Sequence, residues 1–120
     1  MGYDSWGDGR LTLSRPLVWS EYGGSKFAVY SPEDQTNLFL REERGRVTHI
    51  EWRDADESKK YDVLSELTEL AALLRLFDVT VTGWLVRSGE NIGDVERYTI
   101  VDGVVVSEKA VLRWPDGSTV

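Results

Sequence analysis

The sequence predicts a small α+β protein: a mostly antiparallel five- to six-stranded sheet with one long helix and one short helix packed on one face. Short runs of alternating apolar and polar residues, separated by turn-forming residues, predict strands that come in hairpins. Residues 59–77 carry leucines at helical spacing and predict the long helix. The length of 120 residues is that of one domain, covering residues 1–120.

The first quarter of the chain mixes turn-forming and apolar residues. Ser14 and Pro16 are typical of the start of a helix, and Gly23-Gly24-Ser25 is typical of its end. The predicted elements are an irregular arm over residues 1–8, a strand over 9–13, a short helix over 17–22, an edge strand over 26–30 and a loop over 31–37.

Two strands, residues 38–43 and 46–52, are predicted on either side of Arg44-Gly45, which indicates a tight hairpin turn. Because side chains alternate along a strand, the second strand is expected to have two distinct faces. One face would carry Val47, His49 and Glu51, and the other would carry Thr48, Ile50 and Trp52.

The segment 59–77 is the clearest helix, since no Gly or Pro interrupts it. Burial of five or six of its apolar side chains, at about 1.5–3 kcal/mol each, would make it the main core-forming element. The expected apolar stripe consists of Tyr61, Leu64, Leu67, Ala71 and Leu74, widened by Leu70, Leu73 and Phe77. The acidic linker 54–58 precedes it, and its negative charges are expected to interact favourably with the positive end of the helix dipole.

The last part of the chain predicts three strands. Gly83 falls within the first, residues 79–87, and indicates a bulge or a close approach of another backbone. Asp102-Gly103 predicts a two-residue hairpin turn between strands 95–101 and 104–114. The element order is then β-α-(β)-β-β-α-β-β-β, and its core part has the order of a ferredoxin-like unit.

The composition excludes several classes of protein. The chain has one His, no Cys and a formal net charge of −7, with pI near 4.7. Zinc fingers, disulfide scaffolds and cysteine nucleophiles are excluded, and a negative field disfavours direct nucleic-acid binding. No apolar run has the roughly 20 residues of a membrane span, and the N-terminus does not resemble a secretory signal, so we expect a cytoplasmic protein.

Catalytic and metal-binding patterns are weak. His49 with Glu51, or the loop containing Glu90 and Asp94, would be needed for a small hydrolase or transferase, which is the alternative function. The acidic run 54–57 lacks the Gly and distal Glu of a calcium loop. We therefore expect no enzyme activity, no catalytic residues, no metal and no cofactor.

Two surfaces are candidates for binding another protein. The first is the face of strand 79–87 turned away from the helix, where Thr82 and Trp84 lie with Tyr98 or Arg97 beside them on the next strand. The alternative is that residues 1–8 or 23–37 cover this face and make a second small core. The second surface is the acidic flank of the long helix, Asp62, Glu66 and Glu69, for which the alternative is an ordinary solvated helix face.

Short motifs near both ends of the chain resemble a family of small uncharacterised proteins of actinobacteria and their phages. The motifs are Met1-Gly2-Tyr3, Pro16-Leu17-x-Trp19, Gly83-Trp84, Gly93-Asp94-x-x-Arg97, Asp102-Gly103-x-Val105 and Arg113-Trp114-Pro115-Asp116-Gly117. The resemblance excludes the acidic middle, residues 54–69. It implies an accessory protein of a phage or mobile element, more often a binder than an enzyme.

These observations predict a non-enzymatic, acidic binding protein, in the host cytoplasm if it is encoded by a phage, that contacts a host or phage protein. The protein is expected to be a monomer or a homodimer. A further alternative is a structural homo-oligomer formed through an exposed edge strand such as residues 104–114.

Overall fold

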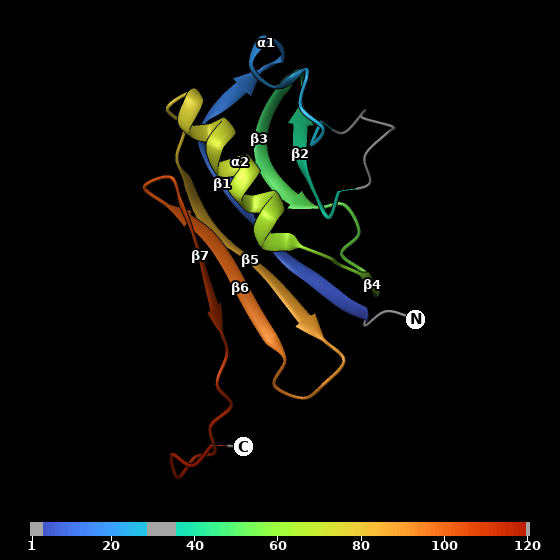
Figure 1. Cartoon of the computed structure of the whole chain (residues 1–120), viewed down its shortest axis with the longest axis vertical. Helices are drawn as coiled ribbons and strands as arrows, with labels where there is room; N and C mark the ends of the chain where they lie inside the picture. The colour runs from blue at the N-terminus through green and yellow to red at the C-terminus, as the bar shows by residue number, and fades with distance from the viewer. Residues whose placement is uncertain (1–3, 29–35, 120) are drawn as a thin grey trace.

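The computed structural model describes residues 4–28 and 36–119, and it has an antiparallel sheet with a helix across one face (Figure 1). The elements are β1 (Asp4–Val18), α1 (Trp19–Tyr22), β2 (Leu38–Glu43), β3 (Arg46–Trp52), β4 (Ser58–Lys59), α2 (Val63–Leu76), β5 (Val81–Gly89), β6 (Val95–Val101) and β7 (Val104–Lys109). No helix among the described residues is both long and apolar enough to cross a membrane.

The predicted α+β class and antiparallel sheet are confirmed, but the sheet has seven strands rather than five or six. Its order is β2-β3-β1-β5-β6-β7, with β4 paired to the first residues of β1. The ferredoxin-like order is not realised, because α1 has a single turn and cannot act as a crossover helix. Residues 29–30 of the predicted edge strand and most of the predicted loop lie outside the described residues, although Ala28 forms one bridge to Leu40.

Strand β1 is the largest departure from the prediction, since Asp4–Val18 is one strand rather than an arm, a short strand and a helix start. It pairs with β5 on one side and with β3 and β4 on the other. Gly7 is needed in this strand because a Cβ there would lie 2.5 Å from Cγ of Trp52. The Trp52 indole N–H also donates to the Asp8 carbonyl (3.0 Å). Contacts distant in sequence therefore override the loop-like composition.

The β2–β3 hairpin is confirmed, with Arg44 and Gly45 both at positive φ. The predicted division of β3 into two faces is wrong at Val47, whereas Ile50 and Trp52 are buried and His49 and Glu51 are only partly buried, as the alternation predicts. The register between the strands shifts between Arg41 and Glu42, so that Val47 and Ile50 are both fully buried. A bulge of this kind changes the side-chain alternation within a strand.

Helix α2 is shorter than the predicted 59–77, because Ser58–Lys59 pairs with β1 and Asp62 takes a left-handed conformation (φ 59°). Tyr61 and Leu64 are exposed, which corrects their placement in the apolar stripe. The helix packs into a core that also contains Leu11, Leu85 and Tyr98 from the sheet. Its buried residues are Val63, Leu67, Leu70, Ala71 and Leu74.

The Asp102-Gly103 turn is confirmed, with both residues at positive φ between β6 and β7. Strand β7 ends at Lys109 rather than at residue 114, and the remaining residues form an exposed segment closed by a bridge between Arg113 and Thr119. Gly83 lies close to the backbone of β1, as expected from its position within a strand. Strands β2 and β7 are the two edges of the sheet.

Candidate functional site

The face of the sheet opposite α2, here called the open face, is the most prominent candidate surface. Directly paired residues of neighbouring strands share a face, so the strand pairings identify its members. Its residues follow from the pairs Arg41–His49, His49–Thr12, Thr12–Thr82, Arg10–Trp84, Val86–Arg97 and Arg97–Glu108. This face is polar, and Trp84 lies near its middle.

Trp84 and Arg97 form the centre of the open face. The Arg97 guanidinium carbon lies 3.9 Å from the centroid of the Trp84 ring, a cation–π contact. Arg97 also forms an ion pair with Glu108 (3.2 Å). Beside this pair is a hollow of about 340 Å³, here called the β5–β7 hollow. It is lined by Val86, Val95, Arg97, Glu108, Lys109 and Ala110.

The predicted residues of this surface do not all lie together. Thr82 and Trp84 lie on the open face, and Arg97 rather than Tyr98 contacts the tryptophan. Tyr98 pairs with Leu85, is only 3% exposed, and makes an edge contact with the Trp52 ring at 6.5 Å. Its phenol is buried, which raises its pKa to about 12. Tyr98 therefore belongs to the core.

The acidic flank of α2 does not present three equivalent free carboxylates. Glu66 accepts hydrogen bonds from the backbone N–H groups of Asn37 (2.9 Å) and Leu38 (3.1 Å), and its partial burial raises its pKa. Glu69 forms an ion pair with Lys26 (2.7 Å). Asp62 immediately precedes the helix, and its side chain is exposed. Two of the three charges thus connect α2 to other segments of the chain.

A second hollow, of about 410 Å³, lies where several loops meet the start of α2. Its lining residues are Thr36, Asn37, Arg53, Asp54, Ser58, Lys59, Lys60, Tyr61 and Glu66. Burial lowers the pKa of both Arg53 and Lys60. Perturbed groups in a hollow are typical of functional sites, so their partners decide how this hollow is interpreted.

The two partly buried cations of the second hollow, Arg53 and Lys60, donate hydrogen bonds to other groups of the chain. Lys60 donates to the carbonyls of Ser5 (2.8 Å) and Asp56 (3.1 Å) and to the Ser58 hydroxyl (2.7 Å). Arg53 donates through Nε to the Thr36 hydroxyl (2.7 Å) and through Nη2 to two carbonyls of residues 26–28. These interactions stabilise the loops and leave Lys60 without a spare donor for chemistry.

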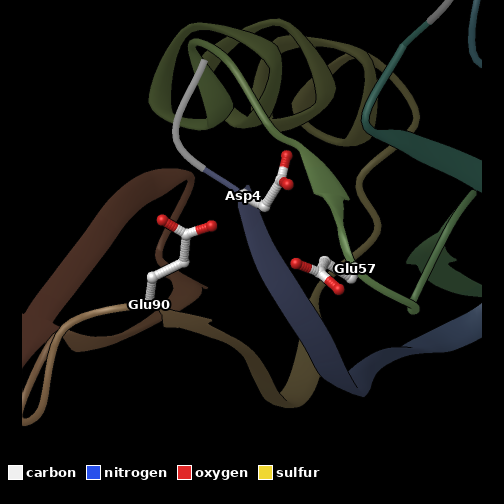
Figure 2. Close-up of side chains that lie close together, drawn as sticks. All are labelled: Asp4, Glu57 and Glu90. Atoms are coloured by element: carbon white, nitrogen blue, oxygen red, sulfur yellow. The ribbon is translucent and has the colours of Figure 1, made fainter. Parts of the chain in front are cut away.

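Three carboxylates that are distant in sequence meet at the start of β1. Figure 2 shows the side chains of Asp4, Glu57 and Glu90, whose carboxylate oxygens lie within 4.8 Å of one another. Carboxylate oxygens are ligands for hard divalent cations. Lys59 lies 3.6 Å from the Asp4 carboxylate and offsets part of the charge. No sequence pattern indicates this cluster, because the strand pairing alone brings its members together.

The residues of the alternative enzyme function are dispersed. The His49 Nδ1 is 2.8 Å from the Thr48 hydroxyl, and Glu51 lies between Arg10 and Arg41 at 4.0 and 3.9 Å. Asp94 is paired with Arg87 (3.0 Å). Neither of the two hollows above has His49 in its lining.

Comparisons with protein-family models, with curated proteins and with solved structures find no significant match to this chain. Its function therefore has to be inferred from its own surface.

Proposed function

We propose that the protein is a non-enzymatic binding protein whose open face docks on another protein. The observation that carries this proposal is the stacked pair of Trp84 and Arg97 beside the β5–β7 hollow. Tryptophan and arginine are enriched among the residues that dominate the energy of protein interfaces. A tryptophan held by a neighbouring guanidinium is also ordered before binding, which lowers the entropy cost of association.

The charges of the open face favour a protein over a nucleic acid as the partner. Arg10 and Arg41 share the carboxylate of Glu51, and Arg97 is paired with Glu108, so these ion pairs leave only one positive charge in excess on the face. A nucleic acid would require a surplus of positive charge along its backbone. The role as an accessory protein of a phage or mobile element, acting in the cytoplasm, is part of the same proposal and rests on the resemblance of short motifs near both ends of the chain to those of such proteins.

The test is site-specific crosslinking from the open face, followed by affinity measurements with the protein that is captured. A photoreactive residue at Thr82 is expected to crosslink a partner protein, and Trp84→Ala is expected to weaken binding by about 30-fold or more, as for a central interface residue. The matched control is Trp19→Ala, since Trp19 is 59% exposed on α1, away from this face. Equal affinities of the Trp84→Ala and Trp19→Ala variants would refute the proposal.

Charge reversal of the acidic flank distinguishes the two predicted surfaces. The double variant Asp62→Lys, Glu69→Lys changes the exposed carboxylates of the flank and leaves the hydrogen bonds of Glu66 in place. If the open face is the interface, this variant retains the affinity of the wild type. A large loss of affinity in it would instead assign binding to the helix flank.

A further inference from the structure

The two edges of the sheet differ, since β2 has a neighbouring segment along its outer side and β7 has none among the described residues. At the β2 edge, Leu40 donates its backbone N–H to the Phe27 carbonyl (2.8 Å), and Ala28 forms a bridge to Leu40. At the β7 edge, no described residue pairs with the outer side of Val104–Lys109. An uncovered edge strand offers a row of free backbone donors and acceptors to another strand.

Most of strand β7 lacks the features that usually prevent edge pairing. It contains no proline, and its six pairs with β6 continue without a register shift. Val106 and Ser107, at its centre, are uncharged, and Val104 is 62% exposed. Natural edges are generally protected by a central charge, a proline, a bulge or a covering segment. β2 has such a covering segment, whereas on β7 the two charged residues, Glu108 and Lys109, lie at one end of the strand and leave Val104–Ser107 uncharged.

The alternation of hydrogen-bonded and non-hydrogen-bonded pairs between β6 and β7 identifies the backbone groups of β7 that β6 does not use. Ala110 donates its N–H to the Val95 carbonyl (2.9 Å), and hydrogen-bonded and non-hydrogen-bonded pairs alternate along an antiparallel ladder. The backbone N–H and C=O of Val105, Ser107 and Lys109 therefore point away from β6, toward an incoming strand.

We propose that β7 pairs antiparallel with β7 of a second copy of this chain, with Ser107 on the two-fold axis. In such a pair, residues whose backbone N–H and C=O point outward must lie directly opposite one another. The two-fold axis therefore lies midway between the two copies of one residue, and not between two successive residue pairs. An axis at Glu108 or Lys109 places like charges directly opposite each other, and an axis at Val105 or Val106 leaves the outward groups of Lys109 facing residues outside β7 of the second copy. An axis at Ser107 places Val105 opposite Lys109 of the second copy. Each outward residue then donates one hydrogen bond and accepts one.

An axis through Ser107 is perpendicular to the sheet. Both copies of α2 then lie on one side of a continuous sheet, and both open faces lie on the other side. The pairing does not depend on the proposed function, but it would present two copies of Trp84 to a partner on one surface. Two linked sites of this kind increase avidity without any new contact.

Sedimentation of the full chain over a dilution series tests the pairing. The wild type is expected to sediment as a dimer that dissociates on dilution. Ser107→Pro removes an outward N–H that β6 does not use, and proline is tolerated at such edge positions, so this variant is expected to be a folded monomer. Ser107→Thr keeps the N–H and is expected to remain a dimer, and circular dichroism checks the fold of each variant.

A charge exchange tests the position of the axis and does not rely on proline. Ser107→Glu and Ser107→Lys are each expected to sediment as monomers, because each would face its own charge across the axis, and their mixture is expected to restore the dimer. A monomeric wild type at every concentration would overturn the proposal. So would a dimer that persists in both Ser107→Pro and Ser107→Glu, since the interface would then lie elsewhere. Trp84→Ala is expected to leave sedimentation unchanged, which separates this test from that of the proposed function.

Discussion

Replacing Gly83 with alanine is expected to destabilise the fold strongly, because the backbone of β1 leaves no room for a Cβ at this position of β5. Gly83 has a φ of +98°, and a Cβ built on it would lie 2.6 Å from the Arg10 carbonyl oxygen. Gly9 has the reciprocal arrangement, with a φ of +75° and a Cβ position that would overlap the Trp84 carbonyl oxygen. The two glycines thus lie on either side of the Arg10–Trp84 pair.

The magnitude follows from two contributions. A left-handed conformation costs an L-residue about 1–2 kcal/mol. Relieving the contact with the Arg10 carbonyl requires the backbones of β1 and β5 to separate, which weakens neighbouring hydrogen bonds worth about 0.5–1.5 kcal/mol each. Together these give about 3 kcal/mol, against a total stability of about 5–15 kcal/mol for a typical domain.

Urea unfolding followed by tryptophan fluorescence measures this loss. The matched control is Gly24→Ala, since Gly24 has no atom within 4 Å of a built Cβ and no positive φ. The control is expected to change the free energy of unfolding by less than about 1 kcal/mol. If Gly83→Ala and Gly24→Ala have the same stability, the close approach of the two strands is not a constraint on the fold, and the reasoning fails.

Three other perturbations test single side chains. Burial raises the pKa of Tyr98 to about 12, so the folded state retains a proton that the unfolded state loses above pH 10. The free energy of unfolding should therefore fall as pH rises from 10 to about 12. Urea titrations of Tyr98→Phe should not show this dependence. The pKa of Glu21 is lowered to about 2, mainly by its hydrogen bond from Arg15. Its small contribution to the stability of the fold should therefore be lost as pH falls from 4.5 toward 2, and Glu21→Gln should not show this loss. Glu66→Ala leaves two backbone N–H groups without their acceptor and should cost about 2 kcal/mol in thermal unfolding, whereas Glu69→Ala should cost less than about 1 kcal/mol.

Features set by residues close in sequence were predictable. The turns at Arg44-Gly45 and Asp102-Gly103 depend on residues that tolerate positive φ, and both hairpins form as expected. The leucine spacing of α2 likewise identifies its buried side. The start of that helix was not predictable, because it depends on the pairing of Ser58–Lys59 with β1 and on the left-handed Asp62.

Features set by distant residues were not predictable. Residues 4–8 have the composition of a loop, yet they form a strand because β4 and β5 provide pairing on both sides. The face occupied by Tyr98 depends on the register between β5 and β6, which the composition of the intervening loop does not determine. The same register brings Arg97 to Trp84, which is one of the two predicted alternatives, and places Tyr98, the other alternative, in the core.

The distribution of charge supports the open face as the site of contact. The chain carries a net charge of −7, yet the ion-paired groups around Trp84 are three arginines, Arg10, Arg41 and Arg97, and only two carboxylates, Glu51 and Glu108. Much of the acidic surplus therefore lies away from this face. On the acidic flank, Glu66 and Glu69 are already engaged by Asn37, Leu38 and Lys26, and a partner would have to displace these contacts. The open face requires no such rearrangement, because its tryptophan is held in place and its hollow is formed before a partner arrives.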